Sequence, residues 1–217
     1  MNTDRIILVD KPAGVSSFFV VAKVRRKLSQ EAGKKVKVGH TGTLDPFATG
    51  LLILLAGKNT KRSNEFLKLD KEYEATVRLG ATSTTGDPEG EIFEREVGKV
   101  PERAEVEKVV EEFVGEILQK VPAFSAVKID GVRAYKLARA GKAVEMPTRK
   151  VKVYRIEILD YVWPELKIRC EVSSGTYIRQ LGEDIGERLG TGGYLMNLRR
   201  TKVGEFSVEK AEKVLDM

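Results

Sequence analysis

Gly39-His40-Thr41-Gly42-Thr43-Leu44-Asp45-Pro46-Phe47-Ala48-Thr49-Gly50 is a polar stretch that runs directly into five aliphatic residues, Leu51-Leu52-Ile53-Leu54-Leu55. It holds three glycines, three threonines and the only histidine of the chain. Glycine allows backbone conformations that are closed to other residues, and a proline restricts the residue before it to extended conformations. The stretch therefore predicts a shaped loop, neither helix nor strand, that fixes the direction of the Asp45 carboxylate. Taken alone, an Asp-Pro pair also fits an ordinary turn before a buried element.

The composition is that of an ordinary globular protein. The chain has 217 residues and a mass of 24.1 kDa, with 41% hydrophobic and 32% charged residues, which suits one large domain or one domain with an insertion. No apolar run is long enough to span a membrane, and the N-terminus lacks a signal-peptide pattern, so we expect a cytoplasmic protein. One cysteine and one histidine supply neither an internal disulfide nor the spacing of a metal site.

Charge is unevenly distributed along the chain. The net charge is +6, from 38 Lys and Arg against 32 Asp and Glu, and the pI is about 9.3. Seven of the cations lie between Lys23 and Lys37, where Glu31 is the only acid, whereas the stretch from Glu102 to Glu116 is strongly acidic. A basic face of this kind is consistent with a polyanionic partner such as RNA, although many basic proteins bind no nucleic acid.

Periodicity predicts the elements of the first half of the chain. We expect a short strand at residues 5–10 and a helix that begins at Ser16 or Ser17 and runs to about Gln30. A second helix is expected from the end of the Asp45 loop through Leu55 to Gly57. Residues 71–80 alternate with period two, which predicts a strand with Tyr73 at the head of its inward-facing row. Taken alone, Tyr73 would be a core tyrosine.

The second half alternates strands with three helices. We expect a short strand near Ile92 and a helix that begins at Pro101, with apolar positions recurring as far as Ile117. A short basic helix covers residues 133–142 and ends at Gly141. Strands at 149–160 and 167–173 follow, and the second of these buries Cys170, which marks that thiol as a core residue. A last helix runs from Ile178 to Gly190.

Several motifs together resemble one family. The stretch GHTGTLDPFATGLL is similar to the signature of the TruB family of tRNA pseudouridine synthases, and further family-like segments follow in the same order at residues 11–17, 71–80, 121–131, 173–179 and 195–201. The resemblance implies an α+β fold, a mixed and largely antiparallel sheet flanked by helices, with a flap insertion at about 124–150. It also implies a single catalytic domain over residues 1–217. Many family members continue into a C-terminal RNA-binding domain, which we do not expect as a separate domain here.

The resemblance also implies an activity: isomerisation of the uridine at position 55 in the T-loop of tRNA, without cofactor or metal. Asp45 matches the family's catalytic aspartate, acting as nucleophile at C1′ or as base at C2′ of the ribose. Arg179 matches the arginine that pairs with this aspartate. Tyr73 matches a tyrosine that packs on the target base and is a candidate for proton transfer at C5.

The resemblance implies roles in base flipping for three more positions. His40 matches the histidine that fills the space left by the extruded base, and Tyr177 and Leu198 match residues that enclose the flipped uracil. Lys11 is a further candidate contact, and Ser174 stands where many relatives carry lysine. Phosphate contacts are expected from the cluster between Lys23 and Lys37 and from the 133–150 segment.

Two alternatives stay open beside a stand-alone enzyme that acts as a monomer on the tRNA T-arm. One is a tRNA-binding or tRNA-folding protein without turnover, but binding alone would not require Asp45, Tyr73 and Arg179 together. The other is a guide-RNA-dependent relative. The His-Thr-Gly form of the loop and the expected lack of a C-terminal RNA-binding domain favour the stand-alone enzyme.

Overall fold

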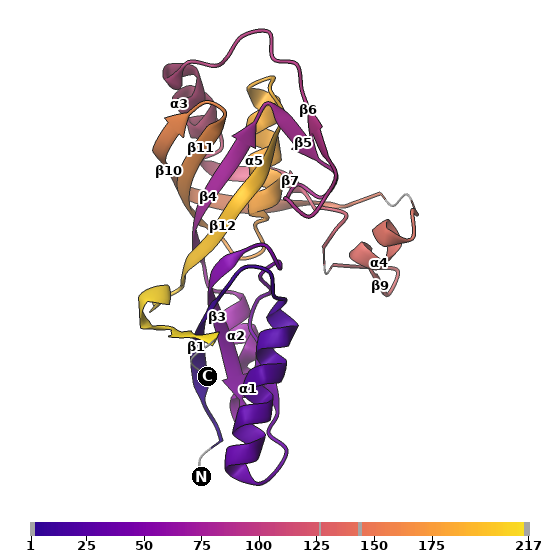
Figure 1. Cartoon of the computed structure of the whole chain (residues 1–217), viewed down its shortest axis with the longest axis vertical. Helices are drawn as coiled ribbons and strands as arrows, with labels where there is room; N and C mark the ends of the chain where they lie inside the picture. Colours follow the sequence, from indigo (N-terminus) through magenta and orange to yellow (C-terminus); the bar gives the residue numbers. More distant parts are fainter. Residues whose placement is uncertain (1–2, 126, 143–144, 215–217) are drawn as a thin grey trace. The chain divides into compact units, whose positions relative to one another are not determined.

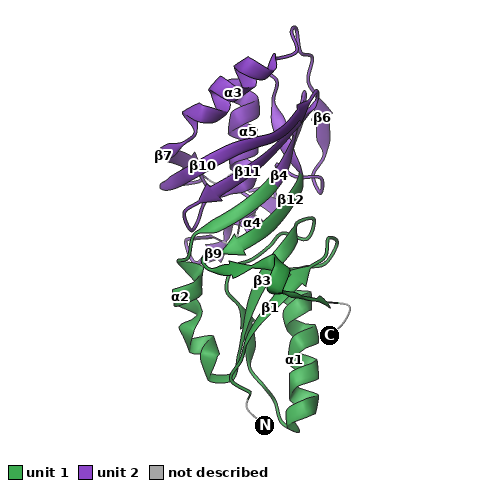
Figure 2. Cartoon of the chain, turned by 90° about the vertical axis from the view of Figure 1, so that its left-hand side faces the viewer, with its two compact units in different colours: residues 1–74, 197–217 green, residues 75–196 purple. Residues whose placement is uncertain are grey.

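A computed structural model describes residues 3–125, 127–142 and 145–214. The chain divides into two compact units, residues 1–74 with 197–217 (unit 1) and residues 75–196 (unit 2), coloured separately in Figure 2. Both boundaries fall inside strands, β4 (Lys71–Leu79) and β12 (Gly193–Val203), so each of these strands contributes to both units. Ala126 of the 121–131 motif and the terminal Met217 lie outside the described residues.

Unit 1 is a small sheet with helices beside it. The strand order is β14-β1-β3-β12, with β2 paired to β3 and β13 paired to β12. Strand β1 is antiparallel to β3, whereas β12 is parallel to β3, with Arg200 opposite Gly50. The strands proper to this unit are β1 (Ile6–Lys11), β2 (Val38–His40), β3 (Thr49–Ala56), β13 (Phe206–Ser207) and β14 (Glu212–Lys213). Its helices are α1 (Ser17–Ala32), α2 (Ser63–Leu67) and the 3-10 turns η1 (Gly57–Arg62) and η2 (Val208–Lys210) (Figure 1).

Helix α1 confirms the prediction and settles which serine caps it. Ser16 has extended backbone and its side chain accepts a hydrogen bond from the Phe19 N–H, so Ser16 is the N-cap. At the other end Gly33 adopts φ +62°, a left-handed conformation that glycine reaches without strain. One face of the helix, including Val20, Val24 and Leu28, is buried in unit 1.

The second expected helix is wrong: residues 51–55 belong to strand β3. All five aliphatic residues are at most 1% exposed, so the strand is buried on both faces. Such a strand shows no alternation, and a short continuous apolar run cannot be told from a helix by periodicity. The loop is also shorter than the stretch 39–50 that was expected to form it, because His40 is the last residue of β2 and Thr49 is the first residue of β3.

Unit 2 is a longer sheet with two helices packed on it. The strand order is β12-β4-β11-β10-β7, and β10 is antiparallel to both β11 and β7. Helices α3 (Arg103–Glu112) and α5 (Ile178–Arg188) contact each other and the sheet. The strands are β5 (Ala81–Ser83), β6 (Ile92–Glu94), β7 (Gly115–Lys120), β10 (Thr148–Val162) and β11 (Glu165–Val172), and the flap region holds β8 (Lys128–Ile129), β9 (Val132–Arg133) and α4 (Ala134–Arg139).

The predicted fold class is confirmed, since the sheets are mixed, largely antiparallel and flanked by helices in an α+β arrangement. Most predicted elements of unit 2 are found, including β11 with Cys170 buried. Helix α3 is shorter than expected: it ends at Glu112, and Ile117 lies in strand β7. The chain leaves the helix at Phe113, and Gly115, with φ +112°, begins strand β7. That the whole chain acts as one catalytic domain stays a prediction.

Candidate active site

Asp45 lies half-buried in the loop of residues 41–48 between β2 and β3. This loop has no strand partner, so its backbone groups need other hydrogen-bond partners. The Thr41 N–H donates to the Ile53 carbonyl at 3.0 Å, and the Ala48 N–H closes a turn on the Asp45 carbonyl at 3.1 Å. The stretch is thus an ordered loop, as its glycines and Asp-Pro pair predict.

Ser17 holds the residue before Asp45. Its hydroxyl, at 3% exposure, donates to the Leu44 carbonyl at 2.8 Å and accepts from the Leu44 N–H at 2.9 Å. Since Ser17 opens helix α1, these two bonds fix the loop to the first turn of that helix. Asp45 therefore follows a residue whose N–H and C=O are both held by one buried side chain.

Two buried cations hold the carbonyls on either side of Leu44. The Arg200 guanidinium donates to the Gly42 carbonyl at 3.1 Å and to the Leu51 carbonyl at 2.8 Å. Lys11, which is wholly buried, donates to the Pro46 carbonyl at 3.1 Å, and the Gly14 N–H reaches the same oxygen at 2.9 Å.

Lys11 also donates to the carbonyls of Pro12 and Val15, at 2.8 and 2.9 Å. It therefore ties the turn after β1 to the Asp45 loop. Sequence reasoning named Lys11 only as a candidate contact and did not find Arg200. The signal for Arg200 was weak, since an arginine in a polar run of β12 resembles any exposed strand cation.

His40 is half-buried at the end of β2, and its Nδ1 accepts a hydrogen bond from the Gly42 N–H at 3.3 Å. An accepting Nδ1 orients the ring and leaves Nε2 as the other polar position. Tyr73 and Leu198 are each 8% exposed, and the Thr49 hydroxyl donates to the Leu198 carbonyl at 3.4 Å. These three residues and Asp45 all belong to unit 1, and their roles toward a base stay predictions.

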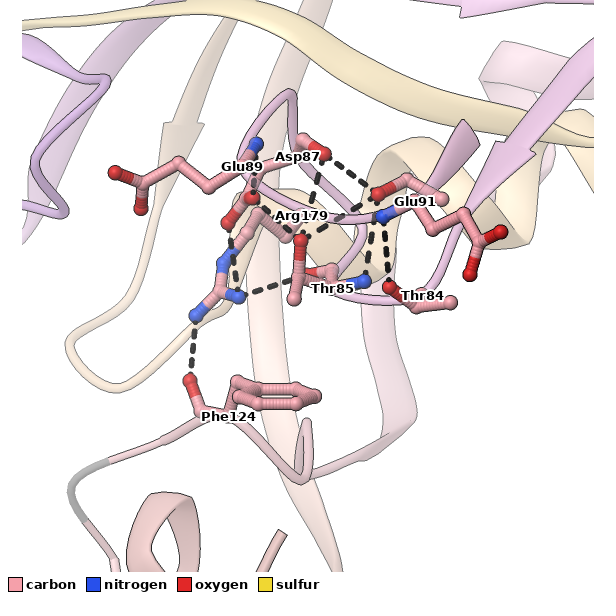
Figure 3. A network of polar contacts seen from close by, with 8 residues as sticks. Thr84, Thr85, Asp87, Glu89, Glu91, Phe124 and Arg179 are labelled. Carbon is pink, nitrogen blue, oxygen red and sulfur yellow. Dashed lines mark hydrogen bonds and ion pairs between the residues drawn. The ribbon is translucent and has the colours of Figure 1, made fainter. Parts of the chain in front are cut away.

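Arg179, the second residue of α5, lies at the centre of a buried network in unit 2 (Figure 3). Its NH1 donates to the Thr85 carbonyl at 2.8 Å and to the Asp87 carboxylate at 3.2 Å, while NH2 donates to the Phe124 carbonyl at 2.8 Å. The two side chains are 7% and 4% exposed, so this is a buried ion pair. Arg179 thereby joins the 84–90 loop to the start of the flap region.

Asp87 was missed by sequence reasoning. Its carboxylate also accepts from the Thr85 hydroxyl at 2.6 Å and from the Glu89 N–H at 3.1 Å, which leaves it fully engaged. A signal did exist: Gly86-Asp87-Pro88 repeats the Asp-Pro pair of the Asp45 loop. The predicted pairing of Arg179 with Asp45 joins residues of different units and stays a prediction.

Glu183 adds a titratable group beside this network. It lies one turn after Arg179 on α5, and its carboxylate is packed against Gly86. Any side chain at position 86 would clash, because an added Cβ would lie 2.3 Å from Glu183 Oε1. The pKa of Glu183 is raised to about 7, mainly by burial and next by the negative charge of Asp184, while the Arg179 guanidinium opposes the rise.

Tyr177 is the last residue before α5 and is held through its backbone. The Gln119 side-chain amide donates to the Tyr177 carbonyl at 3.0 Å and accepts from its N–H at 2.8 Å. The ring packs against a small apolar cluster formed by Val121 and by Ala134 and Met146 of the flap region. The Arg149 guanidinium lies over the same ring, 5.3 Å from its centre, so Tyr177 belongs structurally to the flap region.

Among the residues that the structure describes, no group of His, Cys, Asp and Glu could hold a metal ion. No helix within the described ranges is long and apolar enough to cross a membrane.

Two family models match the chain. TruB family pseudouridylate synthase (N terminal domain) covers residues 25–178, and tRNA pseudouridylate synthase B C-terminal domain covers residues 179–217.

Curated relatives named tRNA pseudouridine synthase B are similar over most of the chain. The protein from Aquifex aeolicus is 47% identical over 96% of this chain and 71% of its own length. The Pseudomonas fluorescens protein is 49% identical over 95% of this chain, which spans 66% of that relative. The Bacteroides fragilis protein is 48% identical over 94% of this chain and 88% of its own length.

Solved structures give the same fold. In a Cbf5-Nop10-Gar1 complex one chain is 33% identical, with a TM-score of 0.73 over 97% of this chain and 52% of its own length. A structure titled pseudouridylate synthase matches at 16% identity with a TM-score of 0.53, which supports the fold alone. The chain thus spans about half the length of the matching chain in that complex. From the family models and the curated relatives, the chain belongs to the TruB family of pseudouridylate synthases.

Proposed function

We propose that this protein isomerises uridine to pseudouridine at position 55 in the T-loop of tRNA, with Asp45 as the carboxylate that acts at the ribose. The observation that carries the proposal is the anchoring of the Asp45 loop. The carbonyls of Gly42, Leu44 and Pro46 each accept a hydrogen bond from a buried side chain of another element. This anchoring supports a fixed position for the Asp45 carboxylate, which attack or proton abstraction at the ribose requires.

The reaction breaks the bond from C1′ to N1 of uracil and forms a bond from C1′ to C5. The proton on C5 is lost to solvent and N1 gains one, so the atoms and the oxidation state are balanced. A carboxylate held in a fixed direction can attack C1′ or remove the proton at C2′. Tyr73 is our candidate for the proton transfer at C5, with Arg179 as the charge partner of Asp45.

The base must leave the folded T-loop before it can react. We assign His40 to the space left by the base, and Tyr177 and Leu198 to the enclosure of the flipped uracil. The 124–150 insertion would act as the flap over the RNA. In support, Tyr177 packs on apolar residues of that insertion and Arg179 donates to Phe124 at its start.

A stand-alone enzyme fits better than a guide-dependent one. The relatives named tRNA pseudouridine synthase B are 43–49% identical, whereas the matching chains of a Cbf5-Nop10-Gar1 complex and of an H/ACA RNP are 33% and 31% identical. Activity should therefore need only the protein and a tRNA transcript. We further expect a monomer located in the cytoplasm.

The test is release of tritium from C5-labelled uridine in a T-arm transcript without any guide RNA. Wild-type protein should release tritium, and Asp45→Asn should not. The matched control is Asp70→Asn, an exposed carboxylate in the same unit, which should retain full activity. A transcript with cytidine at the target position should release nothing above background.

Binding of the transcript without tritium release, on full-length tRNA as well as on the T-arm, would refute the isomerase. The non-catalytic tRNA-binding protein would then be the better description. Equal release by wild type and Asp45→Asn would refute the role of Asp45.

A further inference from the structure

The outer surface of helix α1 carries a hollow of about 590 Å³. Its lining includes Phe19, Lys23, Arg25, Arg26 and Ser29 of the helix and Lys35 of the loop that follows. Phe19, Lys23 and Arg26 are spaced by four and three residues, so they form one stripe along the helix. The Val36 N–H donates to the Ser29 hydroxyl at 3.0 Å, which folds the loop with Lys35 back onto this stripe.

Two aromatic side chains are exposed at the start of this surface. Phe18 is 66% exposed and Phe19 is 52% exposed, although both belong to the first turn of α1. Large apolar groups this open on a strongly basic helix are characteristic of a contact surface. They neighbour Ser17, whose hydroxyl holds Leu44 beside Asp45. The surface therefore begins at the Asp45 loop and extends along the helix.

Three of the four cations that line the hollow are available for a ligand. Within the described ranges, no acidic side chain forms an ion pair with Arg25, Arg26 or Lys35, and the nearby Glu31 pairs instead with Arg5. The cations near α3 differ, because Arg103 and Lys99 are bonded to glutamates at 2.8 and 3.1 Å. Unpaired guanidinium and ammonium groups around an exposed ring are suited to phosphates and a base.

The length of the helix indicates which part of an RNA would bind. Arg26 lies nine residues after Ser17, which is roughly 13 Å further along the helix axis. A single flipped nucleotide at Asp45 would not reach that far, so the ligand must be RNA that flanks the target.

We propose that the α1 hollow is a second RNA contact, in which Arg25, Arg26 and Lys35 bind phosphates of the strand flanking the target uridine and Phe19 stacks on a base. The proposal rests on the proposed function for the identity of its RNA. It adds a binding surface on unit 1 that is distinct from the flap region.

The experiment compares two triple variants in binding to full-length tRNA and to a T-arm transcript at several KCl concentrations. Arg25→Gln, Arg26→Gln and Lys35→Gln together remove three charges from the hollow. Lys99→Gln, Arg103→Gln and Lys108→Gln remove three charges from the region of α3. Lys23 is left unchanged because its ammonium donates to the Val214 carbonyl and so has a structural bond.

The hollow variant should bind full-length tRNA about tenfold more weakly at 0.15 M salt. The slope of log K against log salt should fall by about two, because each phosphate contact contributes roughly 0.7–0.9 to it. The control variant should change neither quantity beyond twofold. A salt slope equal to that of the control would overturn the proposal.

Phe19→Leu tests the stacking separately, since leucine keeps apolar bulk but has no π face. We expect about fivefold weaker RNA binding with the salt slope unchanged. Binding equal to that of wild type would remove Phe19 from the contact.

Binding is measured in the Asp45→Asn background as well, so that it does not depend on turnover. If wild type releases no tritium but the hollow variant still loses affinity and salt slope, the RNA surface stands and the isomerase fails. If wild type releases tritium and the hollow variant keeps its kcat/KM and its affinity, the surface fails and the isomerase stands.

Discussion

Ser17→Ala tests whether the anchoring of the Asp45 loop matters for catalysis. The substitution deletes a buried hydroxyl and leaves the N–H and the carbonyl of Leu44 without their partner. A buried polar group that loses its hydrogen bond costs roughly 1–3 kcal/mol, so we expect a loss of about 2–4 kcal/mol in the free energy of unfolding. A domain of ordinary stability, about 5–15 kcal/mol, would remain folded at 25 °C.

The effect on turnover should be larger than the effect on binding. A catalytic group displaced by about 1 Å can lose roughly a hundredfold in rate, so kcat should fall about 10- to 100-fold with little change in KM. The assays are urea unfolding and single-turnover tritium release at saturating protein.

Ser16→Ala is the matched control because Ser16 precedes it directly and also accepts a backbone N–H, that of Phe19. Loss of this cap should cost about 1 kcal/mol of stability and leave kcat unchanged. If Ser17→Ala loses the expected stability but keeps wild-type kcat, Ser17 does not position Asp45 and the reasoning fails. The same holds if both variants lose kcat in proportion to their stability.

Three further outcomes are expected. Asp87→Ala should lower the free energy of unfolding by about 3–5 kcal/mol, measured in urea, because it removes the carboxylate of a buried ion pair with Arg179. A loss below about 1 kcal/mol would contradict this. The pKa of Glu183 is raised from 4.5 to about 7 in the folded protein, so between these pH values Glu183 holds a proton that the unfolded chain releases, and stability falls as pH rises. In thermal unfolding, Glu183→Gln should match wild type at pH 4 and be more stable than wild type at pH 8. A variant that is less stable than wild type at pH 8 would refute the shift. Arg200→Lys keeps the charge but lacks the forked guanidinium that reaches both the Gly42 and the Leu51 carbonyls. Tritium release should therefore slow, and the free energy of unfolding should fall by about 1–3 kcal/mol. Wild-type values in both assays would show that the second hydrogen bond is not needed.

Much of the fold could be predicted from sequence because local signals agree with the structure. The capped helix α1 and the alternating strand β11 follow directly from serine caps and period two. Strand β3 could not be predicted in this way. A strand buried on both faces carries no periodicity, and its state is decided by pairing with β1, which lies about forty residues away.

The residues of the candidate site also differ in whether a local sequence signal marks them. Asp45, His40, Tyr73, Tyr177, Arg179 and Leu198 could be proposed because motifs mark them. The role of Asp87 and the two serine bonds were not predicted, since they depend on contacts across long stretches of chain. Asp87 meets Arg179 from 92 residues away, and Ser17 meets Leu44 from 27.

The anchoring of the Asp45 loop links the candidate catalytic carboxylate to distant parts of unit 1. Alternate carbonyls, those of Gly42, Leu44 and Pro46, are bound by Arg200 of β12, Ser17 of α1 and Lys11 of β1. Three separate elements therefore determine one loop, so an error in packing any one of them should shift Asp45 before the sheet itself is lost. Two positions before Arg200, strand β12 also carries Leu198, whose carbonyl accepts from Thr49 at the end of the loop. A substitution in β12 should therefore change the pocket and the carboxylate together, which predicts strong non-additivity between Leu198 and Arg200 variants in kcat.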